Sequence, residues 1–285
     1  MTRKVRSTFF SRSIQRSIKA VSQALHPGKP AARQRLPVKS KASQARAPTA
    51  VKLPNGFTTG LAGPQHYRLF VPPGARKTAR LPLLVMPHGC SQTTEAFATS
   101  TRMNRIAANE GFAVLYPEQH QFANLRGCWN WHRTRSGKAQ TEADAILATI
   151  LQVCQHHRLI DPKRIALAGL SAGASMAALL AIRHPAHFRA IAMHSGIAPG
   201  MAQSLAGAFN AMRGHGVAAP LSPLAAGTHL PPLLVIQGSA APLVAPTNGL
   251  TVARLWAARE NAKPVPERTV QRGARRPSIL TDYKT

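Results

Sequence analysis

Short apolar runs alternate with longer amphipathic segments over most of the chain after residue 53. The runs are five or six residues long and stop near Pro, Gly or His, which is typical of buried strands. We predict strands at 67–71, 81–86, 112–116, 164–168, 190–194 and 233–238, and helices at 101–110, 141–157, 172–183 and 250–261. Continuous apolar strands that alternate with helices indicate an α/β fold with a mostly parallel, doubly wound sheet.

The first 52 residues follow no such pattern. This arm holds 13 Lys and Arg and no acidic residue, and its apolar residues form no run longer than two. We predict an arm at 1–52, poorly ordered, and a folded domain at 53–285. A basic arm favours an anionic surface such as nucleic acid, lipid headgroups or an acidic polymer, although a solvated tail, a surface helix and an organellar transit peptide remain alternatives. It lacks the apolar core of a secretory signal, which favours a cytoplasmic location.

Composition narrows the class of protein further. The chain has 285 residues, of which 44% are apolar, and a formal net charge of +28. No apolar run reaches the roughly 18–20 residues of a membrane span, so an integral membrane protein is excluded. Three cysteines exclude a disulfide scaffold and a Cys₄ zinc site. The chain has no Cys-x-x-Cys pair, no His-Glu-x-x-His motif and no P-loop, so a metal-binding or phosphate-binding site is not expected.

The most informative motif is a serine between two glycines. Gly169–Gly173 reads Gly-Leu-Ser-Ala-Gly; it follows the predicted strand at 164–168 and opens the predicted helix at 172–183. This strand–turn–helix setting is the one that a nucleophile elbow requires, with Ser171 at the turn. The helix N-terminus at Ala172 would stabilise developing negative charge. The alternative is an ordinary turn made of small residues.

A second loop supports the same interpretation as the serine motif. His88-Gly89-Cys90 follows the predicted strand at 81–86. In a hydrolase of this architecture such a loop supplies a second oxyanion donor, so the amide of Cys90 would act with that of Ala172. The alternative is a tight turn with a hydrogen-bonded histidine.

Four blocks together resemble the poly(3-hydroxybutyrate) depolymerase-family esterases, whose relatives include feruloyl and acetylxylan esterases. The blocks are Leu83–Gln92, Tyr116–Gln119, Gly127–Trp131 and Gly169–Gly173, and the resemblance covers about residues 53–285. It implies an α/β-hydrolase fold and hydrolysis of an ester or polyester through an acyl-enzyme on Ser171, without a metal or cofactor.

The resemblance also bears on residues near the motif. Trp129 and Trp131 would line an acyl or polymer groove, or else lie in the core. Cys90 and Cys128 are expected to approach each other; a disulfide there would suit export, whereas cytosolic thiols would stay reduced. Members of the family are often secreted, and this N-terminus departs from that form.

The other two residues of a catalytic triad are missing from the positions where this family has them. Ala241 occupies the position where the family has its aspartate, and no histidine occurs after His229. In this fold the chain order is Ser, then Asp or Glu, then His. We therefore expect an incomplete C-terminal part and a serine esterase of impaired activity. The alternative is a non-catalytic basic protein that docks on polyester granules, membranes or nucleic acid.

Overall fold

The structure, a computed structural model, describes residues 51–52, 56–75, 80–120, 122–124, 126–216, 225 and 227–285. Residues 1–50 lie outside the described residues, and so do the predictions about the order and partners of the basic arm. All described residues belong to one structural unit, Pro48–Thr285.

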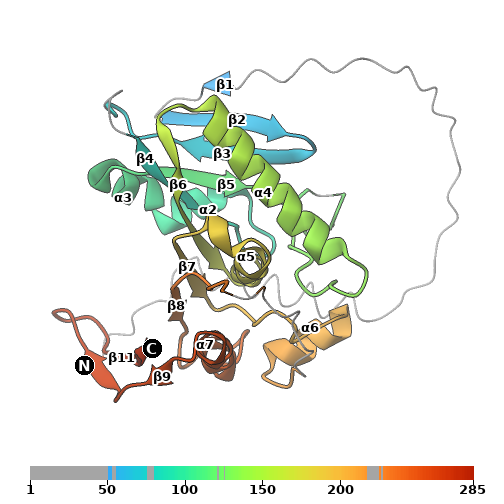
Figure 1. Cartoon of the computed structure of the whole chain (residues 1–285), viewed down its shortest axis with the longest axis vertical. Coiled ribbons are helices and arrows are strands. Elements are labelled where there is room, and N and C mark those ends of the chain that lie inside the picture. Colours follow the sequence, from blue (N-terminus) through green and yellow to red (C-terminus); the bar gives the residue numbers. More distant parts are fainter. Residues whose placement is uncertain are drawn as a thin grey trace, which may run out of the picture. The chain divides into compact units, whose positions relative to one another are not determined.

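Eight strands form the main sheet, in the order β1-β2-β3-β5-β4-β6-β7-β8 (Figure 1). The strands are β1 (Val51–Lys52), β2 (Phe57–Ala62), β3 (Gln65–Phe70), β4 (Leu81–Val85), β5 (Ala113–Pro117), β6 (Ile160–Leu170), β7 (Ala190–His194) and β8 (Leu233–Ile236). The first three strands and β5 pair antiparallel, whereas β5, β4, β6, β7 and β8 run parallel. The predicted mostly parallel α/β sheet is therefore confirmed.

Helices lie on both faces of this sheet (Figure 1). They are α2 (Thr94–Thr101), α3 (Met103–Glu110), α4 (Lys138–His156), α5 (Ala172–Arg183), α6 (Leu205–Met212) and α7 (Thr247–Arg259). On one face α4, α5 and α7 contribute to a large apolar cluster that includes Ile146, Leu180 and Trp256. On the other face α2 and α3 bury Phe97 and Ala107 in a second, smaller cluster.

The helix predicted at 101–110 proves to be the end of α2 followed by α3. Arg102 separates them, because its φ of 55° breaks the helical path. The sequence analysis also missed β2 and α6. Residues of β2 are half-buried over most of their length, so the strand lacks the apolar run of a central strand.

The C-terminal segment does not join the main sheet. There β9 (Lys263–Pro264) pairs with β12 (Tyr283–Lys284), and β10 (Arg268–Val270) pairs with β11 (Ser278–Leu280). Residues 268–270 and 278–280 thus form a separate hairpin that is mostly exposed. Beyond β7, the main sheet ends at β8.

Candidate active site

The serine of the glycine-flanked motif lies at a sharp turn between β6 and α5. Ser171 has φ 55° and ψ −120°. A positive φ is uncommon for a residue with a side chain and costs about 1–3 kcal/mol. The Ser171 amide donates a 2.8 Å hydrogen bond to the carbonyl of His194, and its carbonyl accepts one of 3.1 Å from the Ser175 amide. The strand–turn–helix setting predicted for Ser171 is confirmed.

Both glycines of the motif are required by close approaches of the backbone. A Cβ on Gly169 would overlap the carbonyl of Gly173, and a Cβ on Gly173 would overlap the carbonyl oxygen of Pro87. On the other side of the contact, a Cβ on Gly89 would lie 3.5 Å from the carbonyl oxygen of Leu170. The elbow and the loop after β4 therefore pack backbone against backbone.

The loop after β4 is closed by a disulfide and by local hydrogen bonds. Cys90 and Cys128 are joined, with their Cα atoms 4.3 Å apart, so the expected approach of these cysteines is confirmed. The Gly89 amide donates a 2.9 Å hydrogen bond to Oε1 of Gln92. These links hold the backbone at Cys90. The amide of Ala172 is the first of α5, where helix amides have no carbonyl partner within the helix.

The two tryptophans of the Gly127–Trp131 block are almost fully buried. Trp129 has no exposed surface, Trp131 is 9% exposed, and the Trp129 Nε1 donates a 3.0 Å hydrogen bond to the carbonyl of His88. Trp129 therefore lies in the core, and the prediction that it lines a groove is wrong. Its side chain supports the loop after β4 from the inside of the molecule.

His88 is a structural histidine. Its Nε2 accepts a 3.1 Å hydrogen bond from the amide of Gln119, and its Nδ1 lies 2.8 Å from the carbonyl oxygen of Gly89. A proton on Nδ1 satisfies both contacts. Burial lowers the pKa of His88, so the ring stays neutral at pH 7. Burial likewise lowers the pKa of His132 to about 4.

A buried carboxylate that the sequence analysis did not single out holds the same region from α4. Glu142 accepts hydrogen bonds from the amide of Asn130, at 2.8 Å, and from the Asn130 side chain. The available signal was an acid among the apolar positions of the predicted helix at 141–157, because a buried carboxylate needs such partners.

The loop after β8 reaches the same edge of the sheet, since β8 runs parallel to β7 and β6. Its turn is closed by a 3.2 Å hydrogen bond from the Ala241 amide to the Gly238 carbonyl, and Ala241 is half-buried. The three acids after Ser171 bind elsewhere. Their partners are His229 for Glu260, Thr281 for Glu267 and Arg268 for Asp282.

In the described part of the chain, histidine–carboxylate pairs occur away from Ser171. His184 lies 2.8 Å from Asp144, just beyond the C-terminus of α5, whereas Ser171 precedes its N-terminus. His229 lies 3.0 Å from Glu260 and precedes β8, so it belongs to the opposite edge of the sheet. Neither pair is placed to activate Ser171.

His194 does lie beside the elbow. It ends β7, pairs in register with Leu170, and has an exposed side chain. No hydrogen bond or ion pair joins its ring to a carboxylate among the residues that the structure describes. Within the same residues there is no cluster of three or more His, Cys, Asp or Glu fit to hold a metal, and none of the helices has the length and apolar character to cross a bilayer.

A family model described as "Esterase PHB depolymerase" matches residues 65–249, which include the elbow, the loop after β4 and the disulfide. The chain belongs to this family. Its sequence is 34% identical to poly(3-hydroxyalkanoate) depolymerase C of Paucimonas lemoignei over 135 residues, covering 47% of this chain and 32% of that protein. It is 28% identical to acetylxylan esterase of Coprinopsis cinerea over 162 residues, covering 55% and 43%.

A solved structure agrees on the fold. Acetyl xylan esterase from Aspergillus awamori superposes with a TM-score of 0.60 at 17% identity, covering 75% of this chain and 86% of that one. The α/β-hydrolase fold is therefore confirmed for this depolymerase-family chain. The chain matches between about a third and about three fifths of the length of its curated relatives.

Proposed function

We propose that Ser171 is the nucleophile of a carboxylic-ester hydrolase. The observation that carries this proposal is the backbone of Ser171, which is held at φ 55° between two glycines that admit no side chain. Strain of this kind persists only where the surrounding structure imposes it, and it is common at catalytic residues. The names of the relatives support esters as substrates: polyesters of hydroxyalkanoates, or short acyl esters.

In the proposed reaction the Ser171 Oγ attacks the ester carbonyl carbon. The amides of Ala172 and Cys90 stabilise the negative oxygen of the tetrahedral intermediate. The alcohol then leaves with a proton, and water hydrolyses the acyl-serine to release the carboxylic acid and restore the hydroxyl. No metal or cofactor takes part in these steps.

The proposal includes impaired activity for this chain. The proton of the Ser171 hydroxyl needs a base, and Ala241 cannot orient an imidazole as the family's aspartate does. Without a tethered base, the proton passes to solvent. Enzymes that lose triad members retain only about 10³–10⁴-fold acceleration over water, from the oxyanion hole and binding.

A second candidate is a binding protein without catalysis that uses the hydrolase body and the basic arm to dock on an anionic or polyester surface. Two observations favour this binding protein. Position 241 holds an alanine, and the carboxylates of Asp144 and Glu260 pair with histidines that lie away from Ser171. The two candidates differ in whether Ser171 can be activated once a base is supplied.

Imidazole in solution can supply that base. We expect p-nitrophenyl butyrate hydrolysis by the full chain to rise with imidazole concentration beyond the rise seen for Ser171→Ala, which measures the reaction of imidazole itself. Mass spectrometry of the quenched mixture should show a butyryl group on Ser171. Equal imidazole dependence for the two proteins, with no acylated serine, would overturn the proposed nucleophile and favour the binding protein.

A further inference from the structure

The peptide between Gly89 and Cys90 is held at its carbonyl, whereas its amide has no acceptor. The Gly89 carbonyl oxygen lies 2.8 Å from His88 Nδ1 and accepts a 3.3 Å hydrogen bond from the Gln92 amide. In the described part of the chain, the Cys90 amide donates no hydrogen bond. The peptide is trans, so its carbonyl and its N–H point in opposite directions. The groups that fix the carbonyl therefore also fix the direction of the Cys90 N–H.

The position of the proton on the His88 ring follows from its second neighbour. The Gln119 amide lies 3.1 Å from His88 Nε2, and a backbone N–H can only donate. Nε2 is then the acceptor, so the proton of the neutral ring is on Nδ1, where it donates to the Gly89 carbonyl. With the proton on Nε2 both contacts would fail, because two donors would meet at Gln119 and two acceptors at Gly89.

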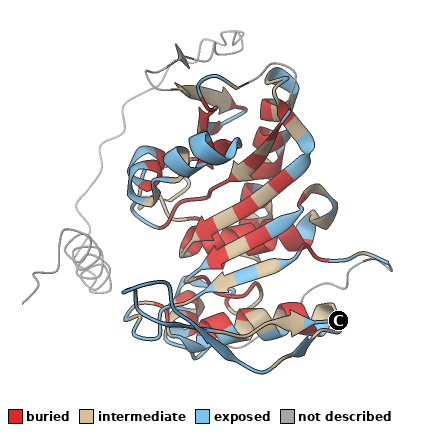
Figure 2. Ribbon diagram, turned by 90° about the vertical axis from the view of Figure 1, so that its left-hand side faces the viewer, coloured by how far each residue is buried: buried red, intermediate tan, exposed pale blue. Residues whose placement is uncertain are grey.

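The ring has little freedom to turn or to change partners. His88 is 1% exposed, and its ring centroid lies 5.5 Å from that of the fully buried Trp129. The side chain of Gln119, also buried, donates a 3.1 Å hydrogen bond to the Cys128 carbonyl and accepts one from the His120 amide. Figure 2 shows buried positions concentrated along strands in the middle of the sheet, where β4 and β5 lead into these two loops. Buried polar groups that are all hydrogen-bonded favour a single arrangement.

The loop that carries this peptide packs directly on the elbow. A Cβ on Gly173 would overlap the carbonyl of His88. A Cβ on Gly89 would lie 3.5 Å from the carbonyl oxygen of Leu170. The residue after Gly89 therefore borders the elbow. The amide of Ala172, at the start of α5, likewise donates to no acceptor in the part of the chain that the structure describes.

We propose that His88 is a positioning residue of the oxyanion hole. Its Nδ1–H holds the Gly89 carbonyl, and the trans peptide thereby aims the Cys90 N–H at the ester oxygen. This role rests on the proposed function, because it concerns the same oxyanion site. His88 touches no substrate and transfers no proton; it acts through the Gly89 peptide. Without that donor the peptide can turn, and an oxyanion donor that turns away from the developing charge loses its effect.

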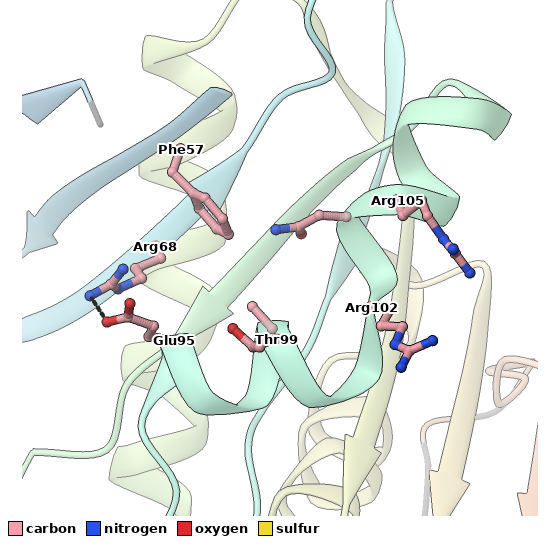
Figure 3. A pocket seen from close by; sticks show the side chains of 8 residues that line it. Phe57, Arg68, Glu95, Thr99, Arg102 and Arg105 are labelled. Atoms are coloured by element: carbon pink, nitrogen blue, oxygen red, sulfur yellow. Dashed lines mark hydrogen bonds and ion pairs between the residues drawn. The ribbon is translucent and has the colours of Figure 1, made fainter. Parts of the chain in front are cut away.

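A surface hollow apart from this network provides a control (Figure 3). Residues of β2, β3, α2 and α3 line it, Arg68 pairs there with Glu95 at 3.0 Å, and none of its lining residues belongs to the elbow or to the loop after β4. The Tyr116 hydroxyl donates a 2.8 Å hydrogen bond to Asn104 of this hollow. Tyr116→Phe therefore removes a hydrogen bond of a buried side chain without changing a partner of His88.

Two amide variants separate the two contacts of the ring. Asparagine places its NH₂ near the position of Nδ1 and can still donate to the Gly89 carbonyl, whereas glutamine reaches the position of Nε2 and keeps only the contact with Gln119. The readout is butyrylation of Ser171 by p-nitrophenyl butyrate at fixed imidazole concentration, on the full chain with its disulfide. We expect His88→Gln to lower kcat about tenfold or more at unchanged KM, whereas His88→Asn and Tyr116→Phe stay within about threefold of the unaltered chain.

A spectroscopic readout needs no substitution. Nitrogen NMR of the unaltered chain at pH 7 should show the His88 proton on Nδ1, with Nε2 unprotonated. A proton on Nε2, unchanged butyrylation by folded His88→Gln, or equal losses in His88→Asn and His88→Gln would overturn the inference, because the ring would then support the fold without aiming the peptide. Failure of the proposed function looks different: the unaltered chain itself would gain no butyryl group on Ser171, and the role of His88 would fall with it.

Discussion

The turn at Ser171 and the loop after β8 reach the same edge of the sheet, yet the chain holds them very differently. Around Ser171, the backbone approaches Gly169 and Gly173 too closely for either to carry a side chain. A disulfide closes the neighbouring loop, and the buried Trp129 donates a hydrogen bond to the His88 carbonyl. After β8, residues 238–240 are exposed, and the turn at Ala241 is closed by one 3.2 Å hydrogen bond.

The difference indicates that the two regions are under different structural constraints. The groups that hold the turn at Ser171 also pack the core, so losing one of them costs folding free energy. In the loop after β8, residues 238–240 are exposed and Ala241 is half-buried, so we expect substitutions there to cost less folding free energy. A substitution in the loop after β8 should therefore affect stability less than one in the turn at Ser171.

Among the changes that test this comparison, removing the disulfide should lower the free energy of unfolding most. Replacing Cys90 and Cys128 together by alanine should lower the free energy of unfolding by about 4 kcal/mol, because the bond closes a loop with a sequence separation of 38. Urea unfolding measures the loss. Cys154→Ala, at the free half-buried cysteine, is the matched control and should cost about 1 kcal/mol. Similar losses from both changes would mean that the disulfide does not stabilise the nucleophile side.

A pair of glycine substitutions compares the two regions directly. Gly173→Ala places a methyl group against the Pro87 and His88 backbone and should cost about 3 kcal/mol or more. Gly238→Ala, in the loop after β8, meets its nearest atom at 3.8 Å and should change stability by less than about 0.5 kcal/mol. Thermal unfolding of the two variants is sufficient. Equal losses would remove the distinction between the regions.

Replacing the strained serine should have a smaller effect and should raise the free energy of unfolding. Ser171→Gly removes the Cβ at φ 55° and should stabilise the fold by about 1 kcal/mol, less the extra chain entropy that glycine brings to the unfolded state. Ser171→Ala keeps the Cβ, so it should stabilise less. If urea unfolding shows Ser171→Gly to be no more stable than Ser171→Ala, the turn is not strained.

Much of the fold could be predicted because the central strands are continuous apolar runs with at least one fully buried face. β4, β5 and β7 lie within one or two residues of the predicted ranges, and α5 spans the predicted residues. Elements with mixed or exposed surfaces were missed. In α2 only three of eight residues are buried, and the C-terminal hairpins present almost no apolar side chain to the core.

The candidate site likewise contains residues whose roles could be predicted from the sequence and residues whose roles could not. Ser171 could be predicted because glycine spacing reports a backbone requirement that the sequence itself carries. The roles of Trp129 and Glu142 could not, because they depend on partners 41 and 12 residues away along the chain. Ala241 was identified only through the family resemblance, since an alanine in a turn has no chemistry of its own.

The most direct test of the proposed site compares kcat/KM for p-nitrophenyl butyrate between the unaltered chain and Ser171→Ala, without added imidazole. When a serine hydrolase lacks its histidine, removing the serine as well costs little further, because triad members act as a unit. The two values should therefore agree within about tenfold. A loss of about 10³-fold or more in Ser171→Ala would contradict the account, because an unidentified residue such as His194 would then complete the site.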